Sequence, residues 1–120
     1  MTSSSPSSIL FDKPQDKERE LGELLAARVF VITAETSPPV SSDGDALLRK
    51  VEPLLGKADA VNITDGAGAR SHMASLAASA LLVKAGFQPI LQMTVRDRNR
   101  LALQNDLLGA GALGVKNILC

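Results

Sequence analysis

The chain has 120 residues, no net formal charge and 2% aromatic residues, so it lacks the basic field and the stacking surfaces that nucleic acids and anionic membranes require. Its single cysteine, Cys120, excludes an internal disulfide and a Cys-based zinc site, which predicts no metal site and a reducing, cytoplasmic location. No apolar run approaches the ~20 residues needed to cross a bilayer, so no membrane span is expected.

Residues 1–27 are predicted to form a Ser-rich disordered arm and then an amphipathic helix. The opening MTSSSPSSILF has neither the basic segment nor the full apolar segment of a secretory signal, and its Ser and Pro content is typical of disorder. Charged residues dominate from Asp12 to Ala27, and Leu21, Leu24 and Leu25 share one face at helical spacing. We expect this helix to pack across the outside or the bottom of the domain that follows.

The first strand and helix of that domain are expected between residues 28 and 55. The apolar, β-branched run RVFVITA at residues 28–34 predicts a strand buried on both faces. Ser42, with Asp45 three residues later, predicts a helix start, and leucines at helical spacing continue the helix toward residue 55. Pro53 lies inside this run, so we expect it to kink the helix or end it early.

Three further strands are predicted from short apolar runs, at residues 60–64, 89–95 and 115–120. Helices are predicted between them at residues 98–108 and at residues 71–85, the latter with these side chains inward: Leu76, Ala77, Ala80 and Leu81. The strand centres recur about every thirty residues, the length of one βα unit. Residues 28–120 are therefore expected to form neighbouring parallel strands joined by helical crossovers.

This periodicity predicts the α/β class and, within it, a (β/α)8 TIM barrel of ~250 residues. A doubly wound open sheet has the same spacing, so spacing alone does not separate the two folds. The chain holds about four of the eight βα units, and we interpret residues 28–120 as the N-terminal half of a truncated barrel. Half a barrel leaves open sheet edges and an uncovered inner face, so a homo-oligomer or a completing polypeptide is expected.

Glu35 comes directly after the apolar run of the first strand. In a TIM barrel, the C-terminal ends of the strands build the active site. A carboxyl group at the rim of an apolar barrel is partly desolvated, which raises its pKa and suits it to general acid catalysis. From position alone, an ordinary solvated loop glutamate is the more common interpretation.

Thr64 and Asp65 end the second strand and open a glycine-rich loop, DGAGAR. Glycines in such a loop let the backbone approach a ligand closely, and their amides can face an anion. The loop lacks the third glycine of the GxGxxG fingerprint, so alone it is a weak signal. His72 follows the loop with no cysteine or second histidine nearby, so we expect a surface or capping role rather than metal ligation.

Polar and basic residues also end the third strand. Gln92 and Thr94 share one face by the period-two spacing of a strand. The run RDRNR follows, and its arginines offer bidentate hydrogen bonds to phosphate or carboxylate groups: Arg96, Arg98 and Arg100. A solvated helix start is the alternative for any single arginine.

Together these segments resemble the methylenetetrahydrofolate reductase family over about residues 29–120. The resemblance rests on VITAETSPP, DAVNITDGAGARSHM and PILQMTVRDRNRLALQNDLLGAGALGVKNILC, whose order and strand-end placement agree best with the short, single-domain prokaryotic members. It implies a TIM barrel that binds a flavin, usually FAD, at its C-terminal face. It also implies an enzyme of one-carbon metabolism that reduces 5,10-methylenetetrahydrofolate to 5-methyltetrahydrofolate, with hydride passing from NAD(P)H through the flavin.

The resemblance implies roles for individual residues as well. Glu35 matches the family's general acid, a glutamate in a segment ending in Pro-Pro, which assists opening of the substrate's imidazolidine ring. Thr64 matches a flavin-contacting threonine, and Asp65, Gln92 and Arg96 complete the cofactor-binding set that we predict. Gln92 departs from the family, because many members carry a flavin-contacting histidine there. Glutamine can hydrogen-bond to a flavin but does not titrate.

A second departure concerns the end of the chain. The family continues after the fourth strand with a Leu-Thr-Gly-Asp type segment, and this chain stops at Cys120, where that segment would begin. We therefore expect the chain to be inactive by itself. Two alternatives stay open: a non-catalytic fragment or interaction piece, and another folate-linked barrel such as a partner of a corrinoid-dependent methyltransferase. A flavin that is weakly held or absent also fits the short members.

Overall fold

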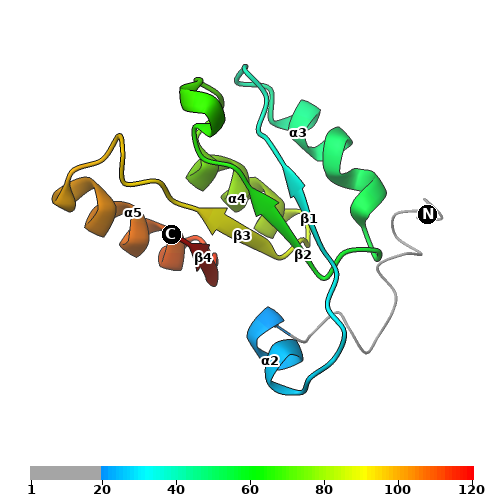
Figure 1. Ribbon diagram of the computed structural model, residues 1–120. Coiled ribbons are helices and arrows are strands. Elements are labelled where there is room, and N and C mark those ends of the chain that lie inside the picture. The colour runs from blue at the N-terminus through cyan, green and yellow to red at the C-terminus, as the bar shows by residue number, and fades with distance from the viewer. Residues whose placement is uncertain (1–19) are drawn as a thin grey trace.

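Strands and helices alternate along residues 20–120, the part of the chain that the computed structural model describes. In chain order (Figure 1) the elements are α2 (Leu21–Ala26), β1 (Thr33–Thr36), α3 (Gly44–Val51), the 3-10 turn η1 (Glu52–Leu54), β2 (Ala60–Ile63), the 3-10 turn η2 (Ala67–Ala69), α4 (Ser75–Lys84), β3 (Pro89–Gln92), α5 (Arg100–Ala112) and β4 (Asn117–Leu119). The predicted alternation is confirmed. The predicted arm and the start of the predicted first helix, residues 1–19, lie outside the described residues.

The four strands form one parallel sheet in the order β1-β2-β3-β4. The predicted parallel pairing of neighbouring strands is therefore confirmed. In the register, Glu35 pairs with Asn62, Asn62 with Ile90, and Ile90 with Asn117. Because all strands run the same way, their C-terminal ends meet at one edge of the sheet (Figure 1). An open parallel sheet of this kind establishes the α/β class.

The apolar core lies on one face of this sheet. There, alternate residues of β2 and the β3 segment pack against the helices in two clusters: Val61 and Ile63 with Leu47, Val51, Ala78 and Leu82, and Leu91 and Met93 with Ala110 and Val115. Side chains alternate along a strand, so the intervening residues point to the opposite face. Asn62, Ile90 and Gln92 are only half-buried there. Helices α3, α4 and α5 thus cover one face and leave the polar strand positions on the other (Figure 1).

The first strand differs from the prediction. It spans Thr33–Thr36, whereas a doubly buried strand was expected at residues 28–34. Val29, Phe30 and Ile32 precede it and are exposed, Phe30 by 87%. The physical reason is that β1 is an edge strand of the described sheet, with β2 as its neighbour on one side. An apolar run at such an edge has no second strand against which to bury itself.

Helix α2 agrees in part with the predicted amphipathic helix. Leu21 and Leu24 are buried as expected, but Leu25 is 59% exposed. The backbone N–H of Leu21 donates to Gln88 Oε1 at 2.7 Å, just before β3 begins. The helix therefore lies at the N-terminal ends of the strands, which confirms the expected packing at the bottom of the domain and leaves the C-terminal edge free (Figure 1).

Helix α3 begins and ends close to the predicted positions, and its N-terminal cap is shifted by one residue. Asp43, rather than Ser42, caps the helix, and its side chain accepts hydrogen bonds from two backbone amides of the first turn. A carboxylate with an extended backbone at this position satisfies two of the otherwise unpaired amides. The helix ends at Val51 and Pro53 lies in the following 3-10 turn, so the predicted early end is confirmed.

Helix α4 buries a different face from the predicted one. Its buried residues are Ser75, Ala78, Ser79 and Leu82, one position before or after the expected set of Leu76, Ala77, Ala80 and Leu81. Nearly every residue of α4 is small or apolar, so the sequence contains no polar stripe to orient the helix. The packing of α4 against β3 decides which face of the helix is buried. Small side chains on that face let the helix approach the strand closely. There, Ser75 Oγ donates to the backbone oxygen of Gln92 at 3.2 Å.

Candidate functional site

Polar side chains gather where the parallel strands end, at the edge of the sheet away from α2. Ser37 follows β1, Thr64 and Asp65 follow β2, and Gln92 is the last residue of β3. Backbone bonding keeps neighbouring strand ends level, since Thr64 N donates to Thr36 O at 3.1 Å. The predicted site residues on different strands are therefore brought to one edge.

Glu35 and Gln92 are in direct contact at this edge. Gln92 Nε2 donates a hydrogen bond to Glu35 Oε2 at 3.0 Å, although 57 positions and the intervening strand β2 separate the two residues. Their chain neighbours Thr36 and Leu91 are buried, on the face that the helices cover. Alternation places Glu35 and Gln92 on the opposite face. The structure thus joins the predicted acid to a predicted cofactor contact.

Two features of Glu35 correct the expectation. It lies inside β1, one residue before the strand ends, rather than directly after the strand. Its side chain is exposed, so the expected desolvation of this carboxyl at an apolar rim is wrong for the described chain. The reason is the edge position of β1, where no element within residues 20–120 shields this face from solvent.

Thr64 is nearly buried, with 6% of the residue exposed. Its hydroxyl donates to the hydroxyl of Ser37, whose oxygen is 2.9 Å away. A hydroxyl oxygen also accepts, so Thr64 Oγ1 keeps acceptor capacity for a ligand. Ser37 was not among the predicted site residues. Its place two positions after Glu35, and so on the same face at the end of the strand, is the signal that would have found it.

Asp65 connects the ends of β2 and β3. Its Oδ2 accepts hydrogen bonds from Thr94 N at 2.8 Å and from Thr94 Oγ1 at 3.1 Å. The Arg98 guanidinium donates to the same oxygen through Nη1, and to Oδ1 through Nη2 at 3.4 Å. Arg98 Nε donates to Asp106 Oδ2 at 3.0 Å, which extends the network to α5. Only 12% of the Asp65 side chain and 16% of the Arg98 side chain are exposed.

These contacts keep both groups of the pair charged. Partial burial raises the pKa of Asp65, but hydrogen bonds from Arg98 and Thr94 outweigh it and hold the pKa below its ordinary value. The hydrogen bond to Asp65 raises the pKa of Arg98 above its ordinary value. Asp65 is therefore an anion at neutral pH, and it is not suited to transfer a proton.

Arg96 lies against the glycine-rich loop. Its Nε and Nη2 donate to Asp97 Oδ2 at 2.9 and 2.7 Å, and Nη2 also donates to Gly66 O at 3.1 Å. The hydrogen bond to Asp97 raises the pKa of Arg96. Its side chain is 48% exposed, so a ligand can reach the guanidinium, although Asp97 offsets part of its charge.

His72 shapes the glycine-rich loop. Its Nε2 accepts a hydrogen bond from Gly66 N at 2.9 Å, and its Nδ1 lies 2.6 Å from Met73 O. Both contacts fit the neutral tautomer that carries its proton on Nδ1. Gly66 has a φ of +62°, and a Cβ there would lie 2.9 Å from Arg96 Nη2, so the turn requires glycine. His72 caps this loop, in agreement with the expected role.

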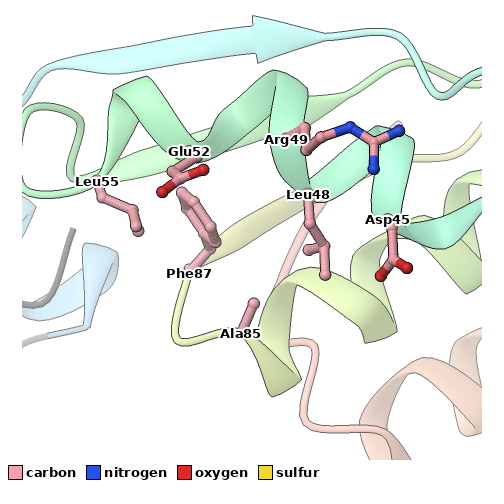
Figure 2. A pocket seen from close by; sticks show the side chains of 7 residues that line it. All are labelled: Asp45, Leu48, Arg49, Glu52, Leu55, Ala85 and Phe87. Atoms are coloured by element: carbon pink, nitrogen blue, oxygen red, sulfur yellow. The ribbon is translucent and has the colours of Figure 1, made fainter. Parts of the chain in front are cut away.

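Within the described residues, this edge has no metal-binding cluster, and the cavity of the helix side lies elsewhere. Within residues 20–120, no three His, Cys, Asp or Glu side chains lie close enough together to hold a metal ion. A cavity of about 400 Å³ lies instead on the helix side (Figure 2), lined from α3, η1 and the turn after α4 by Asp45, Leu48, Arg49, Glu52, Leu55, Ala85 and Phe87. None of the predicted site residues lines it, so it is separate from the candidate site. No helix of the described range has the length and apolar character to span a membrane.

Comparison with known families agrees with these features. The family model for methylenetetrahydrofolate reductase matches residues 20–120, a range that includes every predicted site residue. The chain belongs to the methylenetetrahydrofolate reductase family. Its members are folate-related oxidoreductases, and the family is generally flavin-dependent. No individual curated protein matches the chain.

The strand-end residues fit a flavin of the kind that this reductase family uses. A flavin needs hydrogen-bonding groups for its ring and phosphates on an accessible face. Thr64 Oγ1 and the Gln92 side-chain amide supply such groups on neighbouring strands. The adjoining loop contains Gly68, where a Cβ would have nothing within 4 Å, so its backbone is open to close approach. Thr64, Gln92 and this loop are thus chemically suited to hold the cofactor.

Proposed function

We propose that the protein reduces 5,10-methylenetetrahydrofolate to 5-methyltetrahydrofolate, using NAD(P)H as the reductant and FAD as the bound flavin. One observation carries the proposal: the 3.0 Å hydrogen bond between Gln92 and Glu35, which joins a carboxyl group to a residue that we assign to the cofactor. Family membership supports the class of reaction. The exposure of Glu35 keeps it within reach of a substrate that enters from solvent.

Glu35 acts as the general acid in this proposal. Its carboxyl donates a proton to one nitrogen of the folate's imidazolidine ring, the C–N bond breaks, and that nitrogen leaves as a neutral amine. The one-carbon unit remains on the other nitrogen as an iminium, which accepts hydride. Gln92 holds Glu35 Oε2, so Oε1 is the oxygen left to carry the proton. Solvent returns a proton to the exposed carboxyl after each turnover.

Thr64, Asp65, Gln92 and Arg96 form the cofactor side of the proposed site. A flavin bound there supplies the hydride relay between the nicotinamide and the folate. Thr64 offers its hydroxyl, and Gln92 offers Oε1 as an acceptor while Glu35 holds its Nε2. Arg96 offers an accessible guanidinium of the kind that binds phosphate. Asp65 supports this side of the site, because it connects the end of β2 to the end of β3 through Thr94.

The proposed architecture is a (β/α)8 barrel in which residues 28–120 form the first four βα units. Helix α2 then lies outside the barrel. The face with Glu35 and Gln92 becomes the barrel interior, and the edge at Thr64 becomes the rim that carries the active site. A cytoplasmic location is proposed with it, because the chain has a single cysteine and no disulfide.

Glu35→Gln tests the acid role in the full-length protein. Glutamine keeps the size and hydrogen bonding of Glu35 but has no transferable proton. Reduction of the flavin by NAD(P)H needs no proton from Glu35, so this half-reaction should stay near wild type. Reduction of methylenetetrahydrofolate should fall by ~10²–10⁴-fold, the usual contribution of a general acid. Stopped-flow absorbance of the flavin measures the two half-reactions separately.

Glu52→Gln is the matched control, because Glu52 is an exposed carboxylate beside the helix-side cavity and away from the strand ends. Both half-reactions should be unchanged in this variant. If Glu35→Gln leaves folate reduction near wild type, Glu35 is an ordinary solvated residue and the proposed mechanism fails. A full-length protein that neither binds flavin nor reacts with NAD(P)H would favour the non-catalytic alternative.

A further inference from the structure

The Asp65 carboxylate accepts hydrogen bonds from two residues that follow β3, Thr94 and Arg98. It receives two hydrogen bonds from Thr94, one of them from the backbone, and two from the Arg98 guanidinium. Three of these bonds reach Oδ2, and the fourth reaches Oδ1 at 3.4 Å. A ligand that bound Oδ2 would have to displace a partner, and only 12% of the Asp65 side chain is exposed. The contacts therefore suit Asp65 to connect segments of the chain rather than to bind a ligand.

Arg98 bonds to three residues, Asp65, Thr94 and Asp106. Its guanidinium spans Asp65 and Asp106, and its Nη1 also donates to Thr94 O at 2.8 Å. Asp106 lies on α5 and Thr94 lies just beyond β3, so Arg98 ties both to the end of β2. The planar fork of arginine has donors for all of these oxygens, whereas the single ammonium of lysine is a point charge on a flexible stem.

Neighbouring arginines lack this combination. Arg96 is half-exposed and bonds to the adjacent Asp97 and to Gly66 O, and Arg100 bonds weakly along its own helix to Gln104 at 3.4 Å. Arg96 also reaches the loop after β2 through Gly66 O, but among the arginines of RDRNR only Arg98 bonds to both Asp65 and Thr94. Thr64 directly precedes Asp65, and Gln92 lies two residues before Thr94, so both predicted cofactor contacts adjoin this connection.

We propose that Asp65 and Arg98 are positioning residues: Arg98 fixes Asp65, Asp65 fixes Thr94, and together they set the spacing between Thr64 at the end of β2 and Gln92 at the end of β3. Asp65 then influences the cofactor without touching it. The effect on flavin binding rests on the proposed function, whereas the connection between the strand ends does not.

The test uses the full-length protein with Asp65→Asn, Arg98→Met and the double variant. Amide hydrogen exchange of Thr94 reports the strand connection directly, because its N–H is donated to Asp65. Exchange at Thr94 should accelerate about tenfold or more in Arg98→Met, as expected for loss of hydrogen bonds to charged groups. Arg98→Lys should restore part of the protection. Arg100→Met, the same change two residues away, is the control and should have no effect.

Added FAD is the second readout, measured by quenching of flavin fluorescence. Both single variants should raise the Kd for FAD by several-fold, and the double variant should raise it no further, because the two residues act as one unit. Additive effects, or a raised Kd in Asp65→Asn with unchanged Thr94 exchange, would mean that Asp65 contacts the cofactor directly and would overturn the proposal. Unchanged Thr94 exchange in Arg98→Met would also overturn it.

The design separates two kinds of failure. If the wild-type protein binds no FAD, the proposed function loses its cofactor, but Thr94 exchange still decides whether Arg98 holds Asp65. If Arg98→Met does not fold, Arg98→Lys provides the exchange readout, since lysine keeps the positive charge and the Asp65 acceptor but lacks the planar fork that reaches Asp65 and Thr94 together. Exchange at Thr94 that is faster than in wild type supports the proposal, and exchange equal to wild type contradicts it.

Discussion

Two Asp–Arg pairs stand near the end of β3, and they differ in how far water reaches them. The side chains of Asp65 and Arg98 are 12% and 16% exposed, whereas those of Arg96 and Asp97 are 48% and 65% exposed. Water and salt screen an exposed pair strongly and a nearly buried pair much less. At the scale of single residues, the inner pair is therefore the one whose loss should change stability.

The free energy of unfolding should depend on the ionisation of Asp65. Burial raises its pKa, but hydrogen bonds from Arg98 and Thr94 outweigh this and lower it from the ordinary value of 3.8 in the folded protein. A lowered folded pKa stabilises the protein above the unfolded pKa, and this contribution is lost as the pH falls through the folded pKa. The difference in unfolding free energy between wild type and Asp65→Asn should be constant from about pH 5 to 7 and shrink below about pH 4. Urea titrations across this range measure it.

Asp97→Asn is the control for this measurement. The hydrogen bond from Arg96 also lowers the pKa of Asp97, but that pair is exposed. At ~1 M salt, where the Debye length is ~3 Å, any difference between wild type and Asp97→Asn should vanish, whereas the Asp65→Asn difference should persist. Equal salt sensitivity of the two variants would show that water reaches both pairs and that the inner pair has no special role in stability.

At the scale of elements, the loop after β2 is more tightly specified than the helices around it. Gly66 has a positive φ, its N–H is bonded to His72 and its oxygen to Arg96. Helix α4, by contrast, has a nearly uniform apolar composition, and its buried face was predicted one residue out of phase. A loop with unusual backbone geometry depends on particular residues, while an apolar helix accepts whichever face packs best.

Gly66→Ala should destabilise the protein by roughly 1–2 kcal/mol, the cost of a left-handed conformation for a residue with a Cβ. The new Cβ would also lie 2.9 Å from Arg96 Nη2 and would push that side chain away. Gly111→Ala is the matched control, because Gly111 is in α5 and a Cβ there meets nothing within 4 Å. That change should stabilise the helix by roughly 0.5–1 kcal/mol. Urea unfolding of both variants should give opposite signs; equal signs would contradict the assigned loop geometry.

At the scale of the whole molecule, the two sides of the sheet have different surroundings. Helices α3, α4 and α5 cover the face with the apolar clusters (Figure 1). Apolar side chains are exposed beside both edge strands: Phe30 and Ile32 before β1, and Ile118 and Leu119 within β4. Edge strands with exposed apolar neighbours readily pair with other chains.

A polypeptide of residues 1–120 should therefore self-associate at micromolar concentration. Phe30→Lys combined with Leu119→Lys should shift it toward monomer, because charges on edge strands oppose pairing. Val40→Lys is the control, since Val40 is 83% exposed in the loop after β1 and outside both edges. Sedimentation velocity measures the distribution. A compact monomer in the unchanged polypeptide would show that these apolar edges do not drive association.

The sequence by itself determined the α/β class, the parallel order of four strands and the polar residues at the strand ends, including Glu35, Thr64 and Gln92. Those features depend on local signals: β-branched runs, helical spacing, glycine and proline positions, and the rule that parallel strands end at one edge. Only the tertiary structure decided that Gln92 contacts Glu35 and that Arg98, rather than Arg96 or Arg100, holds Asp65. Contacts between residues this far apart in sequence depend on register and side-chain reach. Local periodicity contains no information about either, nor about the exposure of Glu35 on an edge strand.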